Sequence, residues 1–378
     1  MHGPGSPPHN EVKTNNITAG AVTHEEIFSQ PFLWQTTMER MRGSEVKCLK
    51  AGGPVIVTGA GSSAYAAAAI AVSWPGARAI PTTDLLLYTD DELRDALPHF
   101  AENGLLISLA RSGNSPESVG VVAKFRRLYP RVKHLVITCN ADGQLAQNGG
   151  VERIVLDPRT NDRSLAMTSS FSNLTLAGLA LRHSAELSAT APQICQRVRE
   201  ALPLLDAAAK GVADSRIERM TILASTGLQT LATEGALKIL ELSGGYVFAM
   251  PESFLGLRHG PMSFLRADSV TVCFLSSNPH KRQYEADLIR ELRKKSLGRI
   301  VVIGADGSGV RDVADVWVAA NAPDLPDFLR VPFEIPFVQL LAYHLSLARG
   351  FNPDNPSPAG VITRVVENFR VYEDFGDV

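Results

Sequence analysis

This chain of 378 residues contains the same succession of strand-like, turn-like and helix-like segments twice, once in each half. In both halves a short run of aliphatic and β-branched residues ends in a polar, glycine-containing turn, and a helix-like segment follows. The matched positions, about 165 residues apart, are Gly59 with Gly227, Leu105 with Val270 and Asp142 with Asp306. Landmarks at a nearly constant offset predict two copies of one α/β domain, and the period is too long for a solenoid.

The apolar runs are continuous rather than alternating, which is typical of strands buried on both faces of a parallel sheet. Each run is followed by polar or helix-like sequence. The pattern predicts an α/β fold with two tandem domains, each a doubly wound parallel sheet flanked by helices. The predicted strands are 54–58, 105–109, 134–138, 154–156, 220–224, 270–275 and 300–303.

Boundaries between the parts follow from local signals. Thr23 and Glu26 form a capping-box pattern, which predicts that a helix begins there and that the preceding residues are a disordered arm. The predicted parts are the arm 1–22, the helix 23–50, a first domain 51–190, a helical linker 191–210, a second domain 211–350 and a tail 351–378 near the active site.

Composition limits the classes of partner. The formal net charge is −2 and no basic block occurs, which argues against nucleic acid or an anionic membrane as a partner. The longest apolar stretches, 64–72 and 174–181, are far shorter than the roughly 20 residues that a membrane span needs. The four cysteines show no CxxC and no zinc-binding spacing, and no secretory signal is recognisable. We therefore expect a cytoplasmic, reduced protein without a metal.

The first motif with chemical content is Gly59-Ala60-Gly61-Ser62-Ser63, between a predicted strand and a predicted helix. Glycines allow a sharp turn, and amides at a helix start can hold an anion with help from the two hydroxyls. The dinucleotide fingerprint would need glycine where Ala64 stands. The motif is compatible with an anion site, and also with a tight turn that binds no ligand.

The second motif runs from Arg111 through Ser112 and Ser115 to Glu117, again directly after a predicted strand. Because the carboxyl ends of parallel strands meet at one edge of a sheet, both motifs should lie close together, where such sheets bind ligands. Together they predict a phosphate monoester site built from neutral donors. Ser115 alone is also explained as a helix cap.

The third motif places Glu234, Lys238 and Glu241 on one face of a predicted helix. A solvated face of ion pairs is the ordinary interpretation. The neighbouring residues are mostly apolar, which favours a buried helix and makes these groups candidates for proton transfer. His259 lies in a loop with two glycines and a proline, and its near-neutral pKa range suits acid–base work.

These blocks resemble a known family. GAGSSAY, ARSGNSPES, EGALKILEL and LRHGPMSF are similar to the tandem sugar isomerase (SIS) domains in the isomerase half of glucosamine-6-phosphate synthase. The resemblance is greater to the galactosamine-6-phosphate deaminase/isomerase family, also called tagatose-6-phosphate ketose/aldose isomerases. It spans the chain from about Thr23 and includes the blocks 81–85, 111–118, 137–140 and 162–170 and the tail from 355.

The resemblance implies roles for individual residues. Ser63, Ser112 and Ser115 would hold the sugar phosphate, in a cradle that also includes Gly61, Ser62, Arg111 and Ser169. Glu241 would move a proton between C1 and C2, and Lys238 would assist at the C2 substituent. His259 would open the sugar ring from across a subunit boundary, which implies a homodimer or higher oligomer.

Two departures separate this chain from the synthase. Ala110 and Arg111 stand where the synthase has serine and glutamine, and both leave the phosphate loop plausible. The synthase also has a catalytic lysine in its tail, whereas Val361 stands at that place here and residues 350–378 contain no lysine. Its absence argues against a glutamine-dependent synthase.

The resemblance implies conversion of galactosamine 6-phosphate to tagatose 6-phosphate and ammonia by proton transfer from C2 to C1, with a hexose 6-phosphate as the bound partner. This route needs no cofactor. Glucosamine-6-phosphate deaminase and a deglycase for phosphorylated fructosyl-amines remain as alternatives. A non-catalytic sugar-phosphate sensor is the alternative from another class, since SIS domains also occur in regulators.

Overall fold

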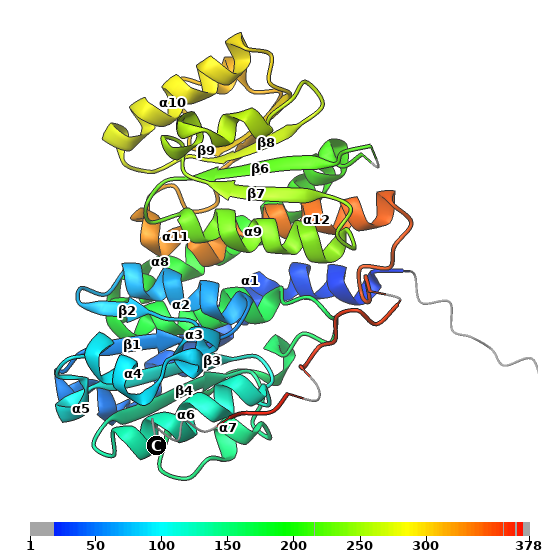
Figure 1. The fold of residues 1–378 in the computed structure, drawn as a ribbon. Coiled ribbons are helices and arrows are strands. Elements are labelled where there is room, and N and C mark those ends of the chain that lie inside the picture. Colours follow the sequence, from blue (N-terminus) through cyan, green and yellow to red (C-terminus); the bar gives the residue numbers. More distant parts are fainter. Residues whose placement is uncertain (1–18, 215, 358, 367–368, 373–378) are drawn as a thin grey trace, which may run out of the picture.

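The computed structural model describes residues 19–214, 216–357, 359–366 and 369–372. In it two five-stranded sheets lie one above the other, with a layer of helices between them (Figure 1). All strand pairs are parallel, and the strand orders are β2-β1-β3-β4-β5 and β10-β9-β8-β6-β7. The two sheets therefore follow the same order of strands, and the predicted α/β fold class is confirmed.

The first sheet contains β1 (Val55–Thr58), β2 (Ala77–Ala79), β3 (Leu105–Ala110), β4 (Lys133–Thr138) and β5 (Glu152–Val155). β1 and β3 are buried along their whole length, because helices cover both faces of the sheet. The helices of this half are α2 (Ser62–Val72), α3 (Thr82–Leu87), α4 (Asp90–Ala96), α5 (Phe100–Asn103), α6 (Pro116–Leu128) and α7 (Gln144–Gln147).

The second sheet contains β6 (Arg219–Ala224), β7 (Phe248–Glu252), β8 (Val270–Phe274), β9 (Arg299–Gly304) and β10 (Val316–Ala319). α9 (Gln229–Leu242) follows β6 and lies on its inner face, whereas α10 (Pro279–Lys294) lies on the outer face (Figure 1). Short 3₁₀ turns complete the chain at Lys47–Ala51, Pro158–Thr160, Gly256–His259, Pro261–Phe264 and Arg311–Val313.

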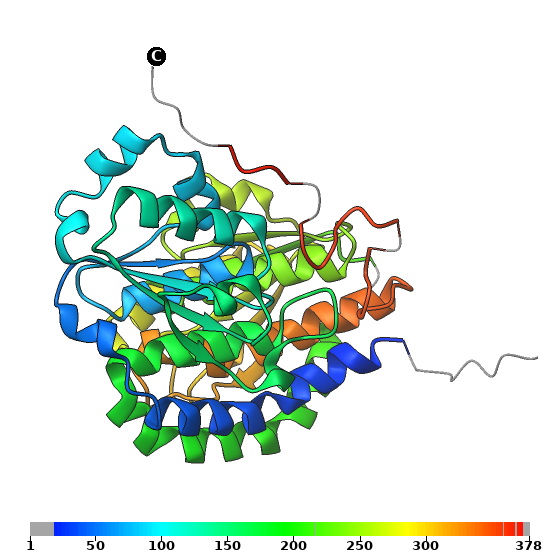
Figure 2. The same cartoon turned by 90° about the horizontal axis from the view of Figure 1, so that it is seen from below.

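The layer between the sheets joins the two halves into one core. α1 (Ala21–Arg42) lies along α8 (Ser169–Val212), as Figure 2 shows, and α11 (Asp327–Glu334) and α12 (Pro336–Ala348) pack beside them. Trp34 of α1 meets Phe333 of α11 edge to face, with ring centroids 5.2 Å apart. One continuous apolar cluster therefore contains residues of both sheets.

The structure changes several predicted boundaries. The first helix begins at Ala21 and ends at Arg42, earlier than residue 50, since Gly43 follows. Residues 1–18 of the predicted arm lie outside the described residues. The predicted linker 191–210 is part of α8, which bends at His183, where φ is −113°. The strands β2, β7 and β10 lie at sheet edges and were not predicted.

The predicted capping box at the first helix is wrong. Thr23 lies inside α1, and its amide and hydroxyl donate to the carboxylate of Asp354 at 2.7 and 2.8 Å. Glu26 turns away from the helix end and accepts from the amides of Arg163 and Ser164. A tertiary contact thus replaces the local cap.

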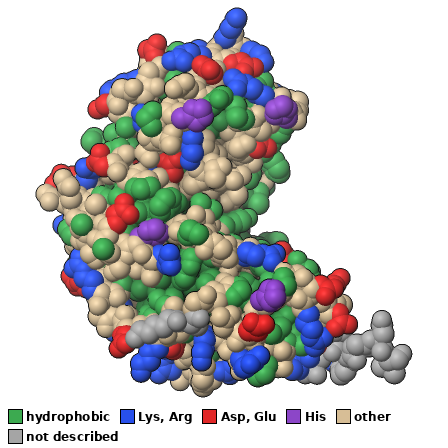
Figure 3. Space-filling model, turned by 90° about the vertical axis from the view of Figure 1, so that its left-hand side faces the viewer, with side chains coloured by type: hydrophobic (Ala, Val, Ile, Leu, Met, Phe, Trp, Pro, Cys, Tyr) green, Lys and Arg blue, Asp and Glu red, His purple; other side chains and the backbone are tan. Residues whose placement is uncertain are grey.

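After α12 the chain leaves the helix layer and runs along one side of the first sheet's half (Figures 1 and 2). Seen from another side, the surface is hollowed between the two halves (Figure 3). The stretch 327–348 is long and apolar enough for a membrane span by length and composition, but 83% of its most apolar window is buried inside the protein.

Candidate active site

A cavity of about 840 Å³ lies where the turns after β1 and β3 face α9 and the C-terminal tail. The structure brings seven of the predicted site residues to its wall: Gly61, Ser62, Arg111, Ser112, Ser115, Lys238 and Glu241. The tail closes the cavity with residues between Phe351 and Val366. The motifs of the first sheet and the acid–base residues of α9 therefore share one site, although they are far apart in the sequence.

The turn after β1 is shaped by its glycines. Gly61 has φ 55° and ψ −130°, a conformation that side chains disfavour, and it lies directly before α2. A Cβ on Gly59 would stand 2.6 Å from the backbone carbon of Ser63, so only glycine allows the helix to start this close. Ser62 and Ser63 are buried in the first turn of α2, and the Ser63 hydroxyl lies 4.0 Å from the Met167 sulfur.

The turn after β3 holds its shape through side-chain bonds to the backbone. The Ser112 hydroxyl accepts from the Asn114 amide at 3.3 Å, and the Asn114 side chain accepts from the Gln144 amide at 3.0 Å. Ser115 lies directly before α6 and donates to Glu117 at 2.7 Å. Because the Ser112 hydroxyl only accepts in this turn, its proton can be donated to an anion in the cavity.

Arg111 has a structural task beside the cavity. Its guanidinium is buried and donates to the carbonyls of Leu165 at 2.9 Å and of Arg364 at 3.0 Å. Burial lowers the pKa of this guanidinium, against the opposite effect of the nearby Asp162 carboxylate. Arg111 therefore ties the turn after β3 to the tail.

On α9 a lysine lies between two carboxylates. Lys238 is buried; its ammonium donates to Glu241 and lies 3.6 Å from Glu234 Oε1. Burial acts to lower the pKa of Lys238, but the two carboxylates outweigh it and raise that pKa above its usual value. Glu241 keeps partial exposure toward the cavity.

Glu234 lies completely buried behind Lys238. Neither carboxylate oxygen has a hydrogen-bond partner among the described residues, and burial together with the Glu241 charge raises the pKa of Glu234 to about 8, against the lowering effect of Lys238. The sequence left open whether this face of α9 was solvated. The structure places Glu234 and Lys238 in the interior, so the ordinary surface ion-pair interpretation is wrong for them.

Three predicted residues do not line this cavity: Ser63, whose hydroxyl contacts Met167, and also Ser169 and His259. Ser169 is fully buried at the start of α8, where its amide donates to Asp162 at 3.0 Å and its hydroxyl accepts from Asn173 at 3.2 Å. These two hydrogen bonds explain why a serine stands at position 169, and no contact with a ligand is needed to explain it. His259 lies exposed in the 3₁₀ turn after β7, away from the cavity wall of the same chain.

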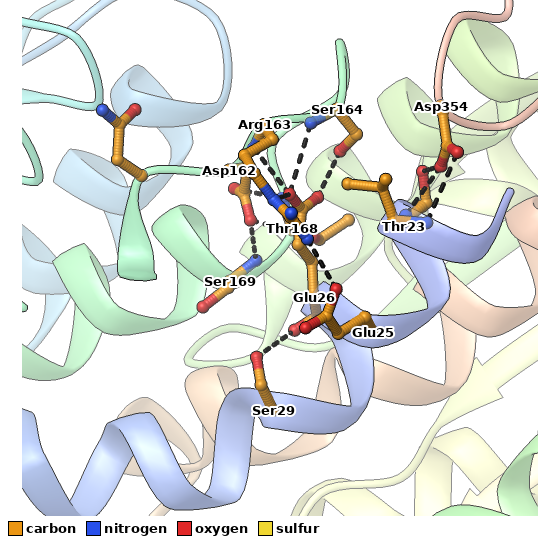
Figure 4. Close-up of polar contacts among 12 residues, drawn as sticks. Thr23, Glu25, Glu26, Ser29, Asp162, Arg163, Ser164, Thr168, Ser169 and Asp354 are labelled. Atoms are coloured by element: carbon orange, nitrogen blue, oxygen red, sulfur yellow. Dashed lines mark hydrogen bonds and ion pairs between the residues drawn. The ribbon is translucent and has the colours of Figure 1, made fainter. Parts of the chain in front are cut away.

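A buried cluster behind the cavity was missed by sequence reasoning (Figure 4). Asp162 accepts from the amides of Thr168, Ser169 and Ser170 at 2.8, 3.0 and 2.9 Å, so its charge lies at the positive end of α8. Glu26 approaches from α1, and burial and the Asp162 charge raise its pKa to about 7. The resemblance to the family included Asp162 in a block, but nothing local indicated that it caps α8.

The tail is attached at two places. Asn352 accepts from the Gly20 amide at 2.8 Å, and Asp354 binds the next turn of α1. Farther on, the Arg364 side chain donates to Asn161 at 2.7 Å and to the carbonyl of Asp162. The tail therefore connects α1, the loop before α8 and the cavity wall. Among the described residues no group of three or more His, Cys, Asp or Glu side chains could hold a metal ion.

Comparison with known proteins gives a consistent result. The chain is 35% identical over 373 residues to the D-galactosamine-6-phosphate deaminase AgaS of Escherichia coli, covering 93% of this chain and 96% of that protein. It is 33% identical to the AgaS of Shewanella sp. strain ANA-3, covering 93% and 91%. No protein-family model matches the chain.

More distant relatives include the isomerizing glutamine–fructose-6-phosphate aminotransferase of Pyrococcus horikoshii, at 26% identity over 88% of this chain and 56% of that protein. Among solved structures, the tagatose-6-phosphate ketose/aldose isomerase of Escherichia coli has a TM-score of 0.80 at 31% identity, covering 91% of this chain and 96% of that one. The resemblance inferred from the sequence blocks is confirmed.

Proposed function

Because the chain belongs to the family of AgaS D-galactosamine-6-phosphate deaminases, we propose that it converts D-galactosamine 6-phosphate and water to tagatose 6-phosphate and ammonia. The observation that carries the proposal is the Lys238–Glu241 pair, which faces the same cavity as the serine-rich turns. An acid–base pair opposite an anion cradle is the arrangement that proton transfer in a phosphorylated sugar needs.

The phosphate would bind at the turns after β1 and β3. Ser63, Ser112 and Ser115 are the proposed donors, with Gly61 and Ser62 supplying the helix-start backbone. Ser112 and Ser115 line the cavity, and the Ser115 hydroxyl would exchange Glu117 for the phosphate as its acceptor. Arg111 would act through the loop that it holds, since its donors are engaged with carbonyl groups. Binding the phosphate would position the open-chain sugar against α9.

The Glu241 carboxylate is the proposed base. It would remove the C2 proton of the open-chain aldehyde to give an enolamine and return a proton at C1. The resulting C2 iminium would add water, and the carbinolamine would lose ammonia to give the ketose. The Lys238 ammonium donates a hydrogen bond to Glu241 and so holds that carboxylate in place at the cavity wall.

Ring opening is assigned to His259 of the partner subunit. His259 is exposed and lies outside the cavity of its own chain, which leaves it free to reach a second copy. The proposal therefore includes a homodimer, and a cytoplasmic location remains part of it. Mixing the Glu241→Gln and His259→Asn proteins tests the dimer. If each site combines Glu241 of one chain with His259 of the other, a mixed dimer contains one intact site and regains activity. If each site is built within one chain, the mixture stays inactive.

A test of the function itself is ammonia release from 6-phosphorylated amino sugars. Glu241→Gln keeps the shape and removes the base, so turnover should fall by roughly 10²- to 10⁴-fold while binding survives. Glu218→Gln, at an exposed glutamate, is the matched control and should leave turnover unchanged. Exchange of the C2 proton with deuterium at the wild-type rate in Glu241→Gln would refute the assignment.

Isomerisation of tagatose 6-phosphate is the second candidate, favoured by the similarity to the solved Escherichia coli isomerase. The same base serves both reactions, so a substrate panel decides between them. Glucosamine 6-phosphate and phosphorylated fructosyl-amines belong in that panel. If no substrate shows C2-proton exchange with the wild-type protein, the chain is a sugar-phosphate sensor rather than an enzyme.

A further inference from the structure

The carboxyl edge of the second sheet carries a turn of the same construction as the phosphate turn of the first. Ser276 is the second residue after β8, as Ser112 is the second residue after β3. The Ser276 hydroxyl accepts from the Asn278 amide at 3.0 Å, as Ser112 accepts from Asn114 at 3.3 Å. α10 and α6, which follow these turns, both begin with proline.

The two turns differ in what they bind. Among the described residues no carboxylate is hydrogen-bonded to Ser112, and its side chain faces the cavity. At the second edge the carboxylate of Asp327, the first residue of α11, accepts from the Ser276 hydroxyl at 2.5 Å and from the Ser277 amide and hydroxyl at 2.8 and 3.0 Å. The second turn thus already holds an anion, supplied by the chain itself.

Two positive groups contact Asp327, and a second carboxylate, that of Glu285, accepts from the Ser276 amide of the same turn at 2.9 Å. The Lys281 ammonium donates to Asp327 at 3.1 Å, and the buried Arg330 guanidinium lies 3.3 Å away. Hydrogen bonds from Ser276, Ser277 and Lys281 lower the pKa of Asp327 despite burial, so the group is ionised. Serine hydroxyls, a backbone amide and two cations are the groups that proteins use to bind phosphate.

The approach of Asp327 depends on Gly227 in the turn after β6. Gly227 has φ +100°, and a Cβ there would stand 2.8 Å from the Asp327 Cβ. A cavity of about 410 Å³ opens beside the carboxylate, bounded by Gly227, Ser277, Lys281 and Phe328 among others. The site therefore has room for a phosphate group if the carboxylate is removed.

We infer that the carboxyl edge of the second sheet is a phosphate-binding cradle filled by the carboxylate of Asp327, and that Asp327 restricts the chain to one phosphate site. The ligand class that it excludes is inorganic phosphate or a phosphate monoester, because a dianion and the Asp327 charge cannot share these donors. This inference goes beyond the proposed function, and it holds whichever sugar the first site takes.

The test counts phosphate ions by isothermal titration with inorganic phosphate as the single anionic ligand. The wild-type protein should bind about one phosphate per chain, at the first site, and Asp327→Ala should bind about two. Asp324→Ala, at a neighbouring exposed aspartate, is the control and should behave as wild type. In Asp327→Ala combined with Lys281→Met the added phosphate should be lost.

Asp327 also pairs with Arg330, so its removal costs stability and a second variant is needed. Asp327→Ser removes the carboxylate and keeps a short polar side chain at the first residue of α11. Inorganic phosphate, compared with chloride at equal ionic strength, should raise its thermal midpoint more than it raises that of wild type. The inference is overturned if both variants match the wild type in phosphate count and midpoint shift, or if the added phosphate survives Lys281→Met.

Discussion

Replacing Asp162 by asparagine should destabilise the protein strongly, although the substitution changes few atoms. Asp162 is fully buried and accepts from three backbone amides and two hydroxyls at the start of α8. All five partners are donors. An asparagine amide group in place of either oxygen therefore turns two donors toward each other and leaves at least one buried amide without an acceptor.

The size of the effect follows from these contacts. Leaving a buried amide unpaired costs about 1–3 kcal/mol, and hydrogen bonds to a charged acceptor contribute about 1.5–3 kcal/mol each, without adding fully. The expected loss is about 3 kcal/mol of the free energy of unfolding, a large share of the roughly 5–15 kcal/mol typical of proteins. KM should also rise, because the loop whose Asp162 carbonyl accepts from Arg364 of the tail would lose part of its attachment to the start of α8.

Chemical denaturation of Asp162→Asn and of the wild type measures this loss. The dependence of the free energy of unfolding on denaturant concentration should be the same in both proteins, because both expose the same surface on unfolding. Asp142→Asn, at an exposed aspartate in the same half, is the matched control and should change the free energy of unfolding by less than about 0.5 kcal/mol. A loss below about 1 kcal/mol in Asp162→Asn would refute the capping argument.

Three further predictions concern the residues around the site. The pKa of Glu26 is raised from 4.5 to about 7, so between these values the native state holds a proton that the unfolded state has lost, and the free energy of unfolding should fall by up to about 3 kcal/mol as pH rises through that window. Glu26→Gln should remove this dependence on pH, which thermal unfolding at pH 5 and pH 8 measures. Gly59→Ala should displace Ser63, lower the free energy of unfolding by about 2 kcal/mol in chemical denaturation and raise KM in kinetic assays. Gly149→Ala, where an added Cβ meets no atom within 4 Å, is the control and should change neither quantity. Arg364→Met removes both bonds of that side chain to the loop before α8 and should raise KM more than it lowers kcat in steady-state kinetics; an unchanged KM would contradict the role given to the tail.

The sequence predicted the interior strands well because their signal is local. The strands β1, β3 and β8 are buried along their whole length and are mostly apolar, with Thr58, Ser108 and Thr271 as their polar residues. The edge strands β2, β7 and β10 are only partly buried, and β7 contains a proline, so neither periodicity nor composition marked them. The fold class and the edge strand β5 could be predicted, and the other three edge strands could not.

The site shows the same division. The turns with Gly61 and Ser112 carry local motifs, and the shared sheet edge predicted that they meet. That Lys238 on α9 joins them was implied only by the resemblance to the family. The burial of Ser169 and the pairing of Glu26 with the loop before α8 depend on contacts between segments more than 130 positions apart, such as 137 for the bond from Arg163 to Glu26. No local pattern encodes such a contact.

The attachment of the tail to α1 has a consequence for synthesis on the ribosome. The amide of Gly20 and its acceptor in Asn352 are 332 positions apart, and Asp354 completes the same turn. At the usual rates of translation these 332 positions take roughly 15–65 s. α1 therefore waits for residues made 332 positions later before its first turn is closed, so the cavity wall is completed only after both halves of the fold have been synthesised.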